Sequence, residues 1–223
     1  MTFQKTLLVM AISGALLTAC SNQKNTQIST LNTKEAPVSE VKTITESEKA
    51  NQLFDAIFDE GVARSPMMQT YLGIKTDYDK WDDISQENKE QELDITKADL
   101  QRVKTIDSTK LDQQTLISYH LFVQQLTNEI ADHQWQFHNY PVNQMFGVHS
   151  QVPAFLINQH SIKNIKEAQD YIARVQKTKA FLEQLTSQLK LREERGIIAP
   201  KFVFPHVIRD SKNILVGAPF EEG

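Results

Sequence analysis

Apolar residues recur at helical spacing along most of the chain beyond residue 45. Three long stripes carry this pattern, starting near Ala50, Leu116 and Ala168. Because residues three and four apart share one face of an α-helix, each stripe predicts an amphipathic helix with one buried side. The alternation that marks a half-buried strand is confined to residues 201–204, too short a run to predict a strand. The pattern therefore predicts an all-α fold of long antiparallel helices.

Capping residues set the limits of these predicted helices. Thr45 and Glu48 have the spacing of a capping box, and the helix that they begin should end near Arg64. Ser65 and Pro66 then offer a new N-cap followed by proline at the first helical position. The same kinds of signal predict further helices over residues 66–71, 86–106, 111–138, 164–195 and 206–216.

Two stretches between the helices carry no helical period. Residues 139–161 are predicted to be an irregular connection between two long helices. Residues 74–83 contain four aspartates around Tyr78 and Trp81, and such spacing can indicate a calcium loop. The central glycine and closing glutamate of an EF-hand are missing, so we expect a solvated acidic loop pinned by Trp81.

The first twenty residues are organised like a bacterial secretion signal. Lys5 supplies a positive charge, Leu7 to Leu17 is an uncharged run, and Thr18 and Ala19 are small residues before Cys20. The apolar run is shorter than the roughly 20 residues that span a bilayer. Residues 17–20 resemble the lipobox of bacterial lipoproteins, in which the cysteine is acylated and becomes the first mature residue. The alternative is an ordinary buried or signal-peptide cysteine.

This interpretation divides the chain into three parts. Residues 1–19 are expected to be a lipoprotein signal peptide, residues 20–44 a flexible polar tether, and residues 45–223 a helical domain. The membrane is then a partner through a lipid anchor on Cys20. Ser21 follows it where many inner-membrane lipoproteins carry aspartate, so we expect an outer-membrane location facing the periplasm.

Composition and motif content exclude several functions. A net charge of −4 argues against nucleic acid, which requires a basic surface. The chain has one cysteine and six histidines, none in His-Glu-x-x-His spacing, and it lacks a nucleophile elbow and a phosphate-binding loop. Glu129 and His133 lie one helical turn apart but have no identifiable third ligand. We therefore predict no catalytic, metal or cofactor residue, and Cys20 is the only predicted site residue.

Several spaced features remain, and they extend from about residue 50 to residue 223. In chain order they are Ser65-Pro66 with Thr70-Tyr71-Leu72-Gly73, then Pro141, Asn143, Gly147 and Pro153, then Ala168 to Arg174, Leu191-Arg192-Glu193, and Gly196 with Pro200. Their order and spacing resemble a family of bacterial secreted proteins and lipoproteins catalogued as domain of unknown function 885.

The resemblance implies that this chain is the N-terminal helical portion of a longer protein. Family members look like zinc metallopeptidases whose His-Glu-x-x-Pro-Gly-His motif lies in the C-terminal half, and no position here matches that motif. Zinc and a peptide substrate are thus implied only for the full-length protein. The helices, and residues 139–161 above all, are expected to wall the substrate cleft and to expose leucine and phenylalanine side chains. For residues 139–161 the alternative is a packed connection between two long helices that does not line the cleft. The alternative is a complete small envelope lipoprotein that acts as a binding module.

Overall fold

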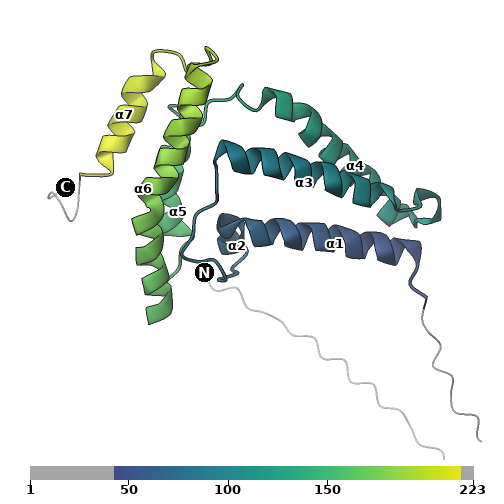
Figure 1. Cartoon of the computed structure of the whole chain (residues 1–223). Helices are drawn as coiled ribbons and strands as arrows, with labels where there is room; N and C mark the ends of the chain where they lie inside the picture. Colours follow the sequence, from purple (N-terminus) through teal and green to yellow (C-terminus); the bar gives the residue numbers. More distant parts are fainter. Residues whose placement is uncertain (1–42, 217–223) are drawn as a thin grey trace, which may run out of the picture. The chain divides into compact units, whose positions relative to one another are not determined.

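A computed structural model of the chain describes residues 43–216 (Figure 1). The predicted all-α fold is confirmed: within these residues the only β feature is an isolated bridge between Val142 and Gly147. Cys20, the predicted signal peptide and nearly all of the predicted tether lie outside the described residues. In chain order the helices are α1 (Glu46–Arg64), α2 (Pro66–Tyr71), α3 (Gln86–Lys104), α4 (Gln113–Asp132), α5 (Val148–Asn158), α6 (Ile165–Glu193) and α7 (Val203–Asn213), with short 3-10 helices η1 (Ser108–Lys110) and η2 (His133–Trp135).

The helix starts follow the local capping signals. The Thr45 hydroxyl accepts a hydrogen bond from the Glu48 amide, and the Glu48 carboxylate accepts one from the Thr45 amide, so the predicted capping box is confirmed. The side-chain oxygens of Ser65, Ser85 and Asn164 each accept a hydrogen bond from the third amide of α2, α3 and α6, so these predicted N-caps are also confirmed. Each cap satisfies backbone amides that have no acceptor inside the helix.

The prediction of an irregular segment over residues 139–161 is wrong in its second half, which forms α5. The helix begins after Gly147, whose φ of 149° favours glycine. It continues through Pro153, although an interior proline removes one helical hydrogen bond. Val152 and Phe155 lie at helical spacing and are both buried. Burial of this apolar face of α5 offsets the loss of the hydrogen bond.

Two further helix limits differ from the predictions. The helix predicted over residues 111–138 is α4, which stops at Asp132 and tightens into η2. The helix predicted from His206 starts earlier, at Val203, with Pro205 in its first turn. Proline is tolerated there because first-turn amides have no acceptor within the helix.

The apolar side chains gather in two clusters. The first lies between α1, α3 and α4, which run side by side in alternating directions (Figure 1), and its buried members are Ile57, Leu100, Val103 and Leu126. The second joins the 74–84 segment to α5 and α6 through Trp81, Val152, Phe155 and Phe181. The Trp81 ring stacks on Phe181, and its indole N–H donates to the Arg174 carbonyl at 2.9 Å. The predicted pinning of the acidic loop by Trp81 is confirmed.

Candidate functional site

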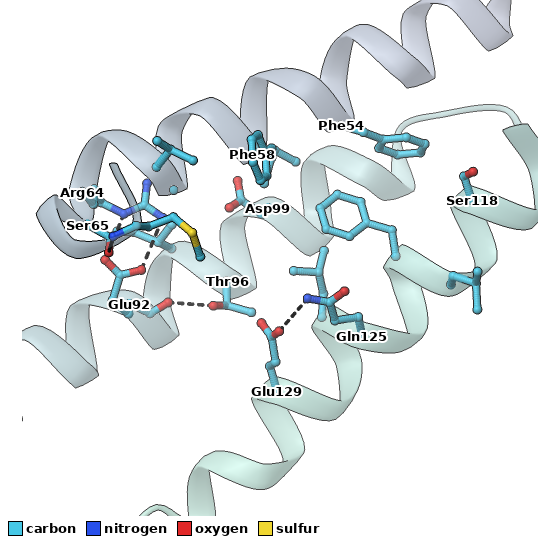
Figure 2. Close-up of a pocket in the computed structure, with 18 residues that line it drawn as sticks. Phe54, Phe58, Arg64, Ser65, Glu92, Thr96, Asp99, Ser118, Gln125 and Glu129 are labelled. Carbon is cyan, nitrogen blue, oxygen red and sulfur yellow. Dashed lines mark hydrogen bonds and ion pairs between the residues drawn. The ribbon is translucent and has the colours of Figure 1, made fainter. Parts of the chain in front are cut away.

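An apolar groove runs between α1, α3 and α4 (Figure 2). Its volume is about 610 Å³, within the range of ligand-binding pockets. Its floor belongs to the first core cluster: Ile57 and Leu126 are buried, and the Phe54 and Phe122 rings meet edge to face at 5.3 Å. The groove is thus an open extension of the core.

The rim of the groove exposes large apolar side chains. Phe58 on α1 is 58% exposed, Leu121 on α4 is 66% exposed, and Met68 on α2 is 45% exposed. Scattered exposed apolar residues are normal on a protein surface, but a contiguous set around a concave floor is typical of binding sites. These three residues define what we call the apolar rim.

Polar groups from α1, α3 and α4 also line the groove. Arg64 holds the Glu92 carboxylate with two hydrogen bonds of 2.9 and 3.3 Å, and Asp99 accepts a hydrogen bond of 2.7 Å from Arg102. Glu129 on α4 accepts a hydrogen bond from the neutral Gln125 amide at 2.9 Å (Figure 2). Among residues 43–216, Glu129 makes no ion pair, so its charge faces the groove without a cation.

Glu129 and His133, one helical turn apart, do not form a metal site. The His133 Nε2 atom lies 3.2 Å from the Glu90 carboxylate and 2.7 Å from the Gln136 amide nitrogen. Glu129 points instead to Gln125. No three His, Cys, Asp or Glu side chains are grouped as metal ligands within the described part of the chain. The residues present here therefore do not fit the zinc that the family resemblance implies for the full-length protein.

The four aspartates of the 74–84 loop are also not gathered into a cation site. Asp77 pairs with Lys80 at 2.7 Å, and Asp79 pairs with Lys177 on α6. Asp82 instead accepts hydrogen bonds from the Ser65 hydroxyl and the Met67 amide, both at 2.8 Å. These contacts lower the pKa of Asp77 and of Asp79, mainly through the lysine hydrogen bonds. Asp77, Asp79 and Asp82 are half-buried and held by these contacts, so the loop is less solvated than the sequence predicts.

The start of the 139–161 segment borders a second apolar cavity. Tyr140, Pro141 and Val142 face the end of α6 and the apolar side of α7 around a volume of about 410 Å³. The cavity is lined mainly by aliphatic side chains, and the one fully buried cation beside it, Arg192, is held by the Gln188 and Asn139 side chains and by backbone carbonyls.

No helix of the described part is long and apolar enough to span a membrane.

These elements can be compared with known proteins. A family model described as "Bacterial protein of unknown function (DUF885)" matches residues 66–223. The chain belongs to the DUF885 family. No curated protein and no solved structure matches the chain.

Only part of the groove is built from the region that matches the DUF885 family. The helices α3 and α4 lie inside the matched region, whereas α1 precedes it. The groove therefore combines two walls from the DUF885 region with one wall from the segment before it. The first cluster and the apolar rim have the same mixed origin.

A buried arginine forms the polar centre of the DUF885 region. Arg174 is fully buried on α6 and donates to the carbonyls of Lys80 and Asp77 and to the Thr70 hydroxyl. A fourth donor contacts the His160 Nδ1 atom at 3.1 Å. Among the described residues no carboxylate lies within ion-pair distance of Arg174, so carbonyls and aromatic faces, including Tyr78 and Trp81, surround the charge. Burial lowers the pKa of Arg174.

Sequence reasoning missed these residues for two different reasons. Arg174 interrupts the apolar stripe of α6 in the way that any solvent-facing cation does, so its burial carries no signal in the sequence. Leu121, in contrast, follows Ile117 by four residues and forms a second apolar stripe on α4, which could have been counted. The predicted site residue Cys20 lies outside the described residues.

Proposed function

We propose that this chain is the lipid-anchored, N-terminal helical portion of a metallopeptidase-like envelope protein of the DUF885 family. In this role the helices supply a binding wall, and the zinc ligands and the general base belong to the C-terminal half of the full-length protein. The peptide substrate is likewise a ligand of the full-length protein. Family membership supports the proposal, as does the apolar groove between α1, α3 and α4.

The open groove is the observation that carries this proposal. Its floor is continuous with the first core cluster, and its apolar rim remains exposed. Apolar surface of this kind lowers the free energy when it is covered, by about 25 cal/mol for each Å² removed from water. A wall that is covered by further protein or by a bound peptide fits this arrangement better than a surface that stays in water.

The anchoring part of the proposal rests on Cys20 and is tested by fractionation. Cys20→Ser should move the protein from the membrane fraction to the soluble fraction and abolish incorporation of labelled palmitate. Ser21→Asp is the matched control: it should keep the label but shift the protein from the outer to the inner membrane. Two or more acyl chains anchor a protein stably, whereas one chain holds it only marginally. Palmitate incorporation into the Cys20→Ser protein would refute the anchor.

A second function is favoured by the same groove. The chain would then act as an envelope lipoprotein whose function is binding, and the groove would be its binding site. The nucleotide sequence downstream of the Gly223 codon distinguishes the two. A reading frame, intact or shifted, that encodes His-Glu-x-x-Pro-Gly-His supports the metallopeptidase-like protein, and an unrelated neighbouring gene supports the binding module.

A further inference from the structure

We infer that the groove between α1, α3 and α4 docks an amphipathic helix that carries apolar side chains along one face and a lysine or arginine at its border. The inference rests on the binding role proposed for these helices and names the chemistry of the partner. It concerns a segment of another polypeptide, held by the apolar rim and by Glu129.

The charges that line the groove argue for a cationic partner. Three carboxylates line it, those of Glu92, Asp99 and Glu129, and the single cation among the lining residues, Arg64, is already paired with Glu92. Asp99 is paired with Arg102. Glu129 is the remaining carboxylate, and within residues 43–216 it accepts a hydrogen bond from the neutral Gln125 amide and forms no ion pair. A cation brought by the partner would complete an ion pair at this end of the groove.

The shape of the groove argues for a helix. Its walls are helices, and residues 43–216 offer no strand edge to which an extended peptide could add. Helix-in-groove recognition uses apolar side chains at i, i+3, i+4 and i+7, which enter an apolar channel between helices. Phe58 on α1 and Leu121 on α4 lie on opposite walls, so they can contact the apolar stripe of a docked helix from both sides.

The test uses the full chain with Cys20→Ser in every sample, so that no acyl chain contributes. The probe is a fluorescent designed helix with leucines at the spacing above and lysines at the border of the stripe. A second peptide carries glutamates in place of the lysines. Fluorescence anisotropy should show saturable binding of the lysine peptide and much weaker binding of the glutamate peptide, with a salt dependence for the lysine peptide.

Matched variants locate the contact. Leu121→Asn should weaken binding about tenfold or more, since central apolar anchors dominate such interfaces. Ile117→Asn, one turn earlier on α4 and outside the groove, should leave binding unchanged. Glu129→Gln should weaken binding of the lysine peptide about threefold, as expected for an exposed ion pair, while Glu87→Gln should not. Leu121, Ile117, Glu129 and Glu87 are all exposed, and circular dichroism melting checks that each variant folds.

Four results would overturn the inference. They are the absence of saturable binding, equal binding of both peptides, equal effects of Leu121→Asn and Ile117→Asn, and a concentration-dependent dimer that Leu121→Asn abolishes. The last result would mean that a second copy of the chain occupies the groove. None of these outcomes bears on membrane fractionation of the Cys20→Ser protein, so failure of the docking inference and failure of the lipid anchor are separable.

Discussion

Acid should destabilise this protein through one buried histidine. His160 is 4% exposed and lies between Arg174 and the Glu167 carbonyl. Because a guanidinium only donates, the Nδ1 atom of His160 must accept the Arg174 hydrogen bond, and Nε2–H donates to the Glu167 carbonyl at 3.3 Å. The folded protein therefore requires the neutral ring. Protonation at Nδ1 would place two donors, both positively charged, against each other.

The surroundings of His160 lower its pKa from the ordinary value of 6.5. Burial of the ring is the main cause, and the positive charges of Arg174 and Lys75 act in the same direction. The Glu167 carbonyl and the Asp170 carboxylate act in the opposite direction and do not reverse the shift. The ring also packs on Tyr78 at 3.9 Å between centroids, and only 4% of the His160 surface is exposed to water.

The sign and size of the effect follow from proton linkage. Below pH 6.5 the unfolded chain takes up a proton at His160 more readily than the folded chain, because the pKa of His160 is lowered in the folded protein, so the free energy of unfolding falls as the pH falls. The stabilisation by the neutral ring is therefore complete above pH 6.5, the pKa in the unfolded chain. It is lost as the pH falls from there to the lower pKa of His160 in the folded protein. Between pH 7.5 and 5.5 this single group should lower the free energy of unfolding by up to about 1.4 kcal/mol.

Urea unfolding followed by circular dichroism at a series of pH values measures this loss. His160→Asn keeps an acceptor for Arg174 without a titrating group, so it should be less stable at pH 7.5 but should lack the wild-type pH dependence. His206→Asn, at an exposed histidine on α7, should keep that dependence in full. This role of His160 would be refuted by a wild type that shows no loss between pH 7.5 and 5.5, or by a His160→Asn protein that retains the same loss.

Three further predictions concern the fold. Arg174→Lys should lower the free energy of unfolding by about 3 kcal/mol in urea titrations, because a lysine cannot reach the four acceptors that now surround the guanidinium. Gly147→Ala should cost about 3 kcal/mol in the same assay, since the added Cβ would lie 2.7 Å from the Pro141 carbonyl oxygen at a φ of 149°. Leu126→Ala, at a side chain only 4% exposed, should cost about 3 kcal/mol and lower the thermal midpoint.

The features that the sequence predicts well are those set by neighbouring residues. The capping box at Thr45 and Glu48 and the cap at Ser65 depend on atoms within four residues of one another, so local chemistry alone determines them. The start and stop of α3 follow for the same reason. The all-α fold could be predicted because the apolar stripes extend over several turns and outweigh errors at single positions.

The helix α5 escaped prediction because its favourable contacts are distant in the sequence. Pro141, Gly147 and Pro153 indicate a loop when only their neighbours are considered. Burial of Phe155 against Trp81 and of the adjoining helix face against α6 offsets the penalty of the internal proline. Tertiary packing outweighs local propensity here, and no local signal distinguishes the two outcomes.

The candidate site was hidden for a related reason. The sequence shows that Phe58 belongs to an apolar stripe, but a stripe does not say how much of its width a neighbouring helix covers. In the structure α3 and α4 cover Ile57 and leave Phe58 largely open, and that difference creates the groove. The sequence also does not show that Glu129 lacks an ion-pair partner among residues 43–216. That becomes visible only when the positions of the helices are known.

The contacts around Arg174 differ in kind from those that hold the two apolar clusters together. Each cluster is apolar, whereas the contacts around Arg174 that tie α2 and the 74–84 loop to α6 are hydrogen bonds to Thr70, Asp77, Lys80 and His160. Apolar burial does not depend on pH, but the His160 contact does. Acid should therefore act first on the contacts around Arg174, which lie against Trp81 and Phe155 of the second cluster. Because the groove is built on the first cluster, docking at Glu129 and Leu121 should persist at a pH where the contacts around Arg174 have begun to open.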